Sequence, residues 1–452
     1  MKILIAGGGK VGMALTQQLT AEGHDLTLID LDSSTLESAQ VQYDTMVVSG
    51  NCAAKDVLIR AGIESSDLLI AVTDADEVNL LSCMTAHGLN ANLHTIARIR
   101  NPVYADQIMT MKEVFPLSLA VNPEKRTALE IERLLKYPGF LRRDTFAKGR
   151  VEIVELRVDP DSKLQNIPLT SLSSVVNCRV LVCAVLRDGN AVAPRGDFVL
   201  RQGDRLFVTA PTSDLTSLLK NLGIITRRVH RVLLCGGGRV SYYLASLLEK
   251  DKISVQILEQ DMDRCRELAA LLPDTSVIHG DCSDQSTLAE QGLADCDAVV
   301  SLTGMDETNM LISFFANSQG VPQTITKLSR SKNFSLADSM SLGSVVCPKE
   351  LCSNNIVRYV RAMQNQSGAA ISVHTIADGQ AEAVEFLVDR ETRNCDTPLK
   401  KIKLKPNILI ASITHGTATQ IPNGDSTFTI GDNVVVVTSG RGVLHQINDI
   451  FA

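Results

Sequence analysis

The hydrophobic positions alternate between short apolar runs and longer amphipathic stretches. Apolar runs of strand length stand at residues 2–6, 25–30, 44–48 and 68–73. Residues 11–21 and 54–61 carry apolar side chains at helical spacing between these runs. The fourth run is nearly uninterrupted in apolar residues, which is typical of a strand covered on both faces. The order strand, helix, strand, helix therefore predicts a parallel, doubly wound sheet with right-handed crossovers.

The same alternation recurs in the second half of the chain. Strand-like runs there occupy residues 231–235, 254–259, 275–278 and 298–303. A glycine-rich segment follows the first strand of each copy, GGGKVG at residues 7–12 and GGGRVS at residues 236–241. An enzyme with one cofactor and one substrate pocket has little use for two such units in tandem. The duplication of a nucleotide-binding pattern therefore favours sensing.

Each copy ends in a helix whose start can be recognised. Asn122-Pro123-Glu124 supplies a cap, a first-turn proline and an acid, whereas Cys347-Pro348-Lys349-Glu350 lacks a good capping residue. We predict helices over residues 122–136 and 348–361 that serve as dimer contacts and hinges. Their apolar stripes would equally serve a plain core.

Short strands and turn signals replace the long alternating units after these helices. Gly203-Asp204 precedes a strand at 205–208, and Gly431-Asp432 precedes a strand at 433–437. The predicted fold class is α/β, with two Rossmann-like doubly wound parallel sheets that are each followed by a small α+β domain. The expected domains are residues 1–140, 141–226, 229–365 and 366–452.

Composition narrows the classes of function. The 452 residues include 4% aromatic residues and no Trp, and the formal net charge is −7, so neither base stacking nor a basic face supports a nucleic-acid partner. No run approaches the ~20 apolar residues of a membrane span, and glycines end the opening apolar run too early for a signal peptide. We expect a soluble, cytoplasmic chain. Its 11 scattered cysteines indicate reduced thiols without a structural metal.

The first glycine motif has the spacing of a phosphate-binding turn. Gly7 permits the tight turn, Gly9 lets backbone N–H groups approach a pyrophosphate, and Gly12 lets helix and strand pack closely. Asp30 follows at about the 20-residue spacing of an acid that binds ribose hydroxyls. Because such an acid repels a 2′-phosphate, NAD(H) or another adenine nucleotide is favoured over NADP(H). The alternative is a plain turn with an acid at a strand end.

The second motif departs from the first at its last position. Gly236 and Gly238 are kept, but Ser241 places a side chain where helix and strand should be closest, and Glu259 replaces the aspartate. We predict binding at this site with a different affinity. A degenerate structural copy is the alternative.

Polar residues follow the fourth strand of each copy. Thr73-Asp74-Ala75-Asp76-Glu77-Val78-Asn79 is repeated as Thr303-Gly304-Met305-Asp306-Glu307-Thr308-Asn309, at the edge that lines the ligand crevice of such sheets. A capped helix start with Asp76 or Asp306 in its first turn is an equally good interpretation. Arg98 and Lys327 follow the fifth strands, where they either reach a phosphate or remain solvated, and we rank them as secondary sites.

This combination of motifs resembles the TrkA family of Trk potassium-uptake regulatory subunits, which contain domains that regulate the conductance of potassium (RCK domains). The similarity covers essentially the full chain and rests on the glycine motif with Asp30, Gly50-Asn51, Ala97-Arg98, the 122–124 helix start and Gly203-Asp204. Asn51 stands where the family usually has an Asp like Asp281, and Ser241 breaks the second glycine motif, so the resemblance does not determine which ligand binds or whether the two sites are equally occupied.

The resemblance implies a peripheral subunit on the inner face of the plasma membrane. It implies binding of NAD(H) or ATP/ADP, assembly into a dimer or tetramer ring, and allosteric gating of a membrane potassium transporter. The candidate nucleotide contacts are Gly7, Gly9, Lys10, Val11, Gly12, Asp30, Asn51, Cys52, Thr73, Asp74 and Arg98, and in the second copy Gly236, Gly238, Arg239, Val240, Glu259, Asp281 and Cys282.

Two other classes of function are weaker. An NAD-dependent dehydrogenase needs a proton-transfer group and a substrate domain, yet none of the 6 tyrosines is followed four residues later by lysine, and the 8 histidines are scattered. A nucleotide-controlled repressor needs a helix-turn-helix module with a basic recognition helix, and no such segment is evident. We therefore expect a regulator without catalytic residues.

Overall fold

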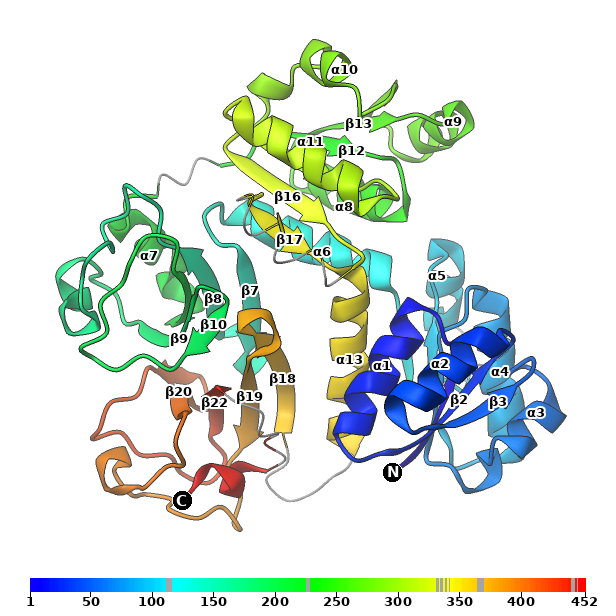
Figure 1. Cartoon of the computed structure of the whole chain (residues 1–452), viewed down its shortest axis with the longest axis horizontal. Helices are drawn as coiled ribbons and strands as arrows, with labels where there is room; N and C mark the ends of the chain where they lie inside the picture. Colours follow the sequence, from blue (N-terminus) through cyan, green and yellow to red (C-terminus); the bar gives the residue numbers. More distant parts are fainter. Residues whose placement is uncertain are drawn as a thin grey trace. The chain divides into compact units, whose positions relative to one another are not determined.

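A computed structural model of the chain describes every residue except 111–115, 225–227, 331–332, 334–335, 338–339, 341, 364–369, 440–443 and 445 (Figure 1). The chain forms two compact units. The first unit contains Met1–Thr127 and Cys347–Val360, and the second contains Ala128–Val346 and Arg361–Ala452. The expected boundaries at 226 and between 365 and 366 lie outside the described residues, and the division into four domains stays a prediction.

The first unit is built on a parallel sheet with the strand order β3-β2-β1-β4-β5-β6. This is the predicted doubly wound order. Its strands are β1 (Lys2–Ala6), β2 (Asp25–Asp30), β3 (Met46–Ser49), β4 (Leu68–Ala71), β5 (His94–Arg98) and β6 (Leu119–Val121). Its helices include α1 (Lys10–Ala21), α2 (Ser33–Tyr43), α3 (Lys55–Arg60), α4 (Asp76–Leu89) and α5 (Pro102–Thr110). The predicted runs at 2–6 and 25–30 coincide with β1 and β2.

The helix α13 (Pro348–Met363) contributes residues 348–360 to this first unit. Its Asn354 accepts a hydrogen bond from Gln18 of α1 at 3.4 Å, and its Asn355 accepts one from Arg126 at 3.1 Å. His94 Nδ1 lies 3.3 Å from the hydroxyl of Tyr359. A helix from the second half of the sequence thus completes a domain formed by the first half.

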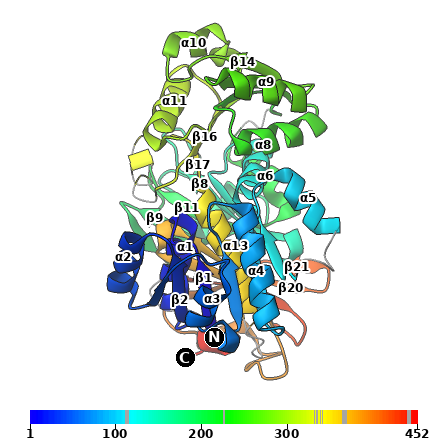
Figure 2. The same cartoon turned by 90° about the vertical axis from the view of Figure 1, so that its right-hand side faces the viewer.

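The second unit contains another parallel sheet, ordered β14-β13-β12-β15-β16-β17. Its strands are β12 (Arg231–Cys235), β13 (Ser254–Glu259), β14 (Ser276–His279), β15 (Ala298–Ser301), β16 (Gln323–Lys327) and β17 (Ser344–Val346). Figures 1 and 2 show α11 (Asp306–Ser318) on one face, and α8 (Arg239–Lys250) and α9 (Met262–Leu271) on the other. The short α10 (Gln285–Glu290) follows β14. The duplication predicted from sequence is confirmed at the level of fold.

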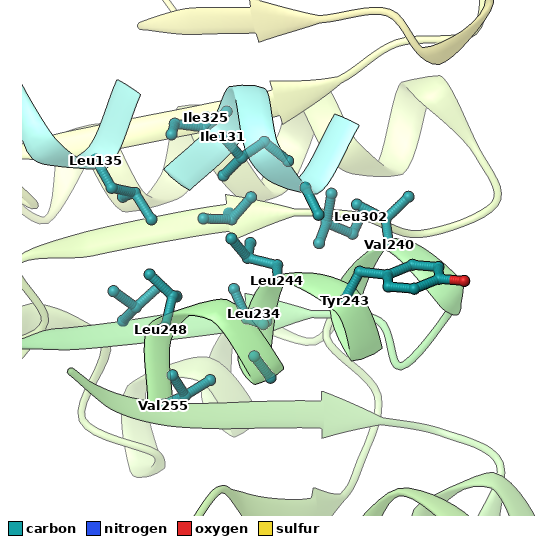
Figure 3. Packing of buried hydrophobic residues seen from close by; sticks show 14 of the residues in the cluster. Ile131, Leu135, Leu234, Val240, Tyr243, Leu244, Leu248, Val255, Leu302 and Ile325 are labelled. Carbon is teal, nitrogen blue, oxygen red and sulfur yellow. The ribbon is translucent and has the colours of Figure 1, made fainter. Parts of the chain in front are cut away.

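The helix α6 (Pro123–Lys136) begins in the first unit and ends in the second. Lys125 N–H donates to the Asn122 side chain at 2.8 Å, which confirms the predicted cap. Ile131 and Leu135 are almost fully buried against α8 and the second sheet, together with Leu244 and Ile325 (Figure 3). The apolar stripe of α6 therefore serves a core, which was the alternative to a dimer contact.

Two antiparallel five-stranded sheets complete the second unit. The first is ordered β10-β9-β11-β8-β7 and uses β7 (Arg142–Phe146), β8 (Val151–Arg157), β9 (Leu181–Arg187), β10 (Asn190–Val192) and β11 (Arg205–Pro211), followed by α7 (Leu215–Asn221). The second is ordered β18-β19-β22-β20-β21 and uses β18 (Ala370–Ile376), β19 (Ala381–Leu387), β20 (Ile408–His415), β21 (Ala418–Gln420) and β22 (Asn433–Ser439). One such sheet follows each Rossmann-like copy, as the predicted fold class requires.

The two small sheets lie side by side and share one core (Figure 1). Phe146, Ile153 and Phe207 of the first pack with Ala383 and Val435 of the second. The contact is reciprocal, because Gln380 accepts from Ala191 N–H at 2.9 Å while Arg150 donates to the carbonyl of Gly416. A repeated domain that pairs through equivalent surfaces has the isologous geometry of a twofold dimer within one chain.

A buried charge cluster joins β7 to β18 at this contact. Asp144 lies 2.8 Å from His374 Nδ1 and 3.0 Å from Arg142 Nε. Burial by itself raises the pKa of Asp144, but the charges and hydrogen bonds of Arg142 and His374 outweigh burial and lower it to about 2. Asp144 should therefore stabilise the fold as a carboxylate.

Replacing Asp144 with asparagine is expected to lower the free energy of unfolding at pH 7 by about 2 kcal/mol. The folded-state pKa lies below the unfolded value of roughly 3.9, so this contribution is present above that value and is lost as the pH falls through about 2. Urea unfolding at neutral and acid pH measures the difference. Asp425→Asn, which breaks an exposed pair with Lys400, is the control and should change stability by less than ~1 kcal/mol. A difference that is the same at every pH would contradict this assignment.

Candidate nucleotide site

The turn between β1 and α1 requires glycine at two positions. Gly7 has a φ of 106°, and a Cβ built on it would lie 2.8 Å from the backbone nitrogen of Thr73. A Cβ on Gly12 would lie under 3.0 Å from the carbonyl oxygen of Gly7, closer than real Cβ contacts. The first and third glycines of the motif therefore have the packing roles predicted from sequence.

The second glycine of the motif faces open space. A Cβ on Gly9 meets nothing within 4 Å, and Gly9 is the N-cap of α1 without a side-chain hydrogen bond to the first turn. The amides of a helix N-terminus carry partial positive charge and suit a phosphate. Lys10 is exposed at this end of the helix, whereas Val11 is buried in the core. A contact from Val11 to a ligand would therefore come from its backbone.

Asp30 lies at the end of β2 beside this turn. Its Oδ2 accepts the Gly8 N–H at 2.5 Å, and its Oδ1 accepts the Asp32 N–H at 2.8 Å. A carboxylate oxygen has a second lone pair, so both oxygens can still accept ribose hydroxyls. We name residues 7–12 with Asp30 the first cradle. It lies at the carboxyl end of β1, where the strand order reverses between β1 and β4, which is the usual ligand position of this fold.

The ends of β4 and β5 bring three more predicted residues together. Arg98 Nη2 donates to the Thr73 carbonyl at 2.5 Å and to Asp74 Oδ1 at 3.0 Å. The Asp74 side chain is fully exposed, while Arg98 is buried. Arg98 is thus not a solvated cation. Asp74 and Thr73 fix it at the edge of the crevice.

The side chains of Asp76 and Asn79 bind backbone groups of the segments at the ends of β4 and β5. Asp76 Oδ2 accepts the amides of Arg100 and Asn101 at 2.8 and 2.7 Å, and Asn79 donates to the carbonyls of Thr73 and Arg98. Both side chains are buried. Asp76 lies in the first turn of α4, as the structural interpretation has it, but the helix start has no side-chain cap, and Asp76 binds the segment after β5 instead. Asp306 accepts the amides of residues 329 and 330 in the same way.

Asn51 and Cys52 follow β3. Asn51 is exposed and its Oδ1 accepts the Ala53 N–H at 3.0 Å. The Cys52 thiol is buried in the core, where Ser82 donates to it at 3.2 Å and burial raises its pKa. Cys52 can therefore reach a ligand only through its backbone.

The second cradle, residues 236–241 with Glu259, repeats this construction in the second unit. Gly236 has a φ of 102°, Gly238 faces open space, and Glu259 accepts the amides of Gly237 and Asp261 at 2.5 and 2.8 Å. The longer side chain of glutamate thus makes the same two contacts as Asp30.

Ser241 does not obstruct the second cradle. Its side chain is fully buried and its hydroxyl donates to the carbonyl of Gly236. A Cβ on Gly236 would meet Leu302 and Thr303 backbone at 3.2 Å, compared with 2.8 Å for Gly7, so this turn lies slightly farther from its neighbouring strand. The serine hydroxyl thus meets the carbonyl that a third-position side chain approaches in this turn.

The rim of the second cradle differs from that of the first. Lys327 donates to the Leu302 carbonyl at 2.9 Å, and Gly304 leaves no carboxylate at the place of Asp74. Asp281 Oδ1 accepts the Ser283 N–H at 2.8 Å, which repeats the Asn51 contact. Arg239 is exposed, whereas Val240 and the Cys282 thiol are buried. Hydrogen bonding with Cys235 lowers the pKa of Cys282.

Sequence reasoning missed three residues of these cradles. The amides of Gly8 and Gly237 bind the acids, and the triple-glycine run was the available signal for them. Arg264 Nε donates to the Gly237 carbonyl at 2.8 Å, and it lies on α9, outside any motif. No local sequence signal marks Arg264 as a residue of this turn.

Metal-ligand clusters and membrane-spanning helices are both absent from the described residues. Within it, no group of three or more His, Cys, Asp or Glu side chains is arranged to hold a metal ion. None of the helices that the structure describes combines the length and apolar character needed to cross a bilayer.

Comparisons with known proteins agree with this architecture. The TrkA-N domain model matches residues 3–115 and 232–348, and the TrkA-C domain model matches residues 153–223. The chain is 32% identical to the Trk system potassium uptake protein TrkA homolog of Archaeoglobus fulgidus, over 100% of both chains. It is 29% identical to the Trk system potassium uptake protein TrkA of Haemophilus influenzae, over 100% of this chain and 98% of that protein.

A solved structure described as the GsuK channel bound to NAD shares the fold. The TM-score is 0.60 at 16% sequence identity, and the match covers 97% of this chain and 76% of the channel chain. At this identity the likeness concerns fold alone.

Proposed function

The chain belongs to the TrkA family, and from that premise we propose that it is the regulatory subunit of a Trk-type potassium-uptake system. The observation that carries the proposal is the uncapped start of α1 beside open space at Gly9, with the Asp30 carboxylate bound to the same glycine turn. The first cradle binds NAD(H) or ATP/ADP. Because its binding surface is mainly backbone amide and one acid, it holds a nucleotide without offering a group to react with it.

The second cradle supports the same function with a different affinity. Its helix α8 also begins at an uncapped glycine, Gly238, and Glu259 reproduces the contacts of Asp30. Two ligand sites in one chain suit a sensor that compares or sums signals. A dehydrogenase would need a substrate domain, whereas both small domains here pair with each other through a shared core.

The proposed partner is a membrane potassium transporter, engaged from the cytoplasmic side. Relatives of this chain carry the name Trk system potassium uptake protein, which supports the assignment. We propose that copies of the chain assemble as a dimer or tetramer ring and that nucleotide shifts the ring between two states. A tenfold preference for one state supplies ~1.4 kcal/mol per site, which is in the normal range of allosteric coupling.

Replacing Asp30 with alanine is expected to weaken NADH binding at the first cradle by about 10- to 100-fold, because hydrogen bonds to a charged acceptor are lost. Calorimetric titration with NADH, NAD, ATP and ADP measures the change and ranks the ligands. Asp56→Ala, an exposed acid in the first turn of α3, is the matched control and should leave every affinity unchanged. If Asp30→Ala binds all four ligands like the wild type, the first cradle is not the site.

Two further measurements separate regulation from catalysis. NADH incubated with the protein and small carbonyl compounds should stay reduced, since steady oxidation would favour a dehydrogenase. Potassium uptake into vesicles that contain a Trk-type membrane subunit should change when the chain and its nucleotide are added together. If the rate of potassium uptake is the same with and without the chain at every nucleotide condition, the proposed partner is wrong.

A further inference from the structure

The helices that follow the two acids differ at every aligned position, and one of these positions lies beside the glycine turn. In the first cradle this position is Thr35, whose hydroxyl donates to Asp32 at 2.6 Å and whose methyl lies 2.5 Å from where a Cβ on Gly8 would be. In the second it is Arg264, which donates to the Gly237 carbonyl at 2.8 Å. An arginine thus occupies the rim of the second cradle where the first has a small, uncharged side chain.

This exchange changes the charge around the ribose position. Each rim carries two acids, Asp30 with Asp32 and Glu259 with Asp261, but residues 31–37 include no basic side chain. In the first copy a cation approaches from α3 instead, where Arg60 donates to the carbonyl of Ser49. In the second rim, Arg264 lies next to the loop that Glu259 binds. The other arginine of that segment, Arg266, is exposed and pairs with Asp263 at 2.8 Å. Arg264 is therefore a cation that contacts the same glycine loop as Glu259.

Two contacts hold the Arg264 side chain in place, and part of its surface stays exposed. Its Nε binds Gly237 and its Nη1 binds Glu267 at 2.6 Å, while the side chain keeps 25% of its surface exposed. A guanidinium fixed at one edge presents its remaining N–H groups in a planar fork, which suits phosphate oxygens. In dinucleotide-binding folds, an arginine near the ribose accommodates a 2′-phosphate that the acid alone repels.

We propose that Arg264 makes the second cradle tolerant of a 2′-phosphorylated adenine nucleotide, whereas the first cradle rejects it. The inference rests on the proposed function, because it presumes that both cradles bind nucleotide. Glu259 still opposes a phosphate, so the second cradle accepts NADPH beside NADH and does not select it. The chain would then respond to two pools of dinucleotide through two separate sites.

The test isolates each cradle with a blocking side chain. Gly9 and Gly238 both have negative φ and open space around a Cβ, so valine at either position fits the fold and occupies the ligand space. The probes are NADH and NADPH, and the quantity is the ratio of their dissociation constants in calorimetry. Gly238→Val blocks the second cradle, so binding to this variant measures the first cradle. Gly9→Val blocks the first cradle, so binding to that variant measures the second.

We expect NADPH to bind about 100-fold more weakly than NADH at the first cradle and within about tenfold of NADH at the second. On the Gly9→Val background, Arg264→Thr should raise the NADPH to NADH ratio about tenfold, while Arg264→Lys should raise it less. On the Gly238→Val background, Thr35→Arg should lower the ratio. These variants exchange the two natural side chains, so each serves as the other's control.

The outcomes separate the inference from the proposed function. If the second cradle binds NADH but Arg264→Thr does not change the NADPH to NADH ratio of dissociation constants, the inference is wrong, whereas nucleotide binding at that cradle is supported. If Gly9→Val protein binds neither probe, nucleotide binding at the second cradle fails, and the inference fails with it. Intact folding of each variant is checked by its unfolding transition, and Thr35→Arg gives an independent answer if Arg264→Thr misfolds.

Discussion

Replacing Gly12 with alanine is expected to abolish nucleotide binding at the first cradle and to destabilise the first unit by about 3 kcal/mol. The added Cβ would lie under 3.0 Å from the Gly7 carbonyl oxygen, which is backbone and cannot rotate away. Relief requires α1 to move from β1, and that movement carries the first-turn amides away from the phosphate position. Calorimetry with NADH and denaturant unfolding measure the two effects together.

Gly9→Val and Gly12→Ser show whether the two effects have the proposed causes. Valine at position 9 meets nothing in the fold, so binding should be lost while the free energy of unfolding stays within ~1 kcal/mol of wild type. Serine at position 12 should be milder than alanine, because its hydroxyl can donate to Gly7 as Ser241 donates to Gly236. Wild-type stability and NADH affinity in Gly12→Ala would show that the turn does not depend on close packing.

The parallel sheets and the places of Asp30 and Glu259 at the strand ends could be predicted because their signals are local. A buried parallel strand must be apolar along its whole length, and the glycine turn and the acid follow it at a spacing fixed by one helix and one strand. β2 and β13 therefore coincide with the runs predicted at 25–30 and 254–259. The cap at Asn122 is local in the same sense, since it needs only the next few residues.

The environment of Ser241 and Arg264 could not be predicted, because it depends on atomic distances and on the rotation of a helix, and a sequence motif specifies only the spacing of residues. Whether serine fits depends on the separation between its side chain and the carbonyl oxygen of Gly236, to which its hydroxyl donates. Whether Arg264 meets the cradle depends on how α9 is rotated above β13, which apolar periodicity defines only coarsely. Thr73 and Asp74 follow one strand and Arg98 follows another, and only the fold shows that the three form one hydrogen-bonded group.

The packing of α6 was beyond sequence reasoning for a different reason. An apolar stripe at helical spacing says that a helix is covered, but it does not say by what. Ala128, Ile131 and Leu135 could have covered the sheet that precedes them in sequence. In the structure they are buried in the core of the second unit, beside Leu244 and Leu248 (Figure 3). Each Rossmann-like copy is thus completed by the helix that ends the other copy in sequence. The helix α6 packs on the second sheet, and most of α13 belongs to the first unit.

Replacing Ile131 with alanine is expected to lower the stability of the second unit by about 3 kcal/mol, because it leaves a cavity between α6 and α8 in a fully buried position. Hydrogen exchange of the amides in β12 and β15 measures the loss in that unit directly. Lys125→Ala, at an exposed position of the same helix, is the control and should change stability by less than ~0.5 kcal/mol. Unchanged protection in Ile131→Ala would mean that α6 is not part of this core.

The combination of Ile131→Ala with Gly12→Ala tests whether α6 couples the two units. Gly12 acts in the first unit, Ile131 acts in the second, and α6 belongs to both. Independent sites add within about 0.5 kcal/mol, whereas sites coupled through a shared element deviate by about 0.5–3 kcal/mol. We expect a deviation, because loosening either end of one continuous helix weakens the hold of the other. Strict additivity would make α6 a passive tether, and nucleotide at the first cradle would then need another route to reach the second unit.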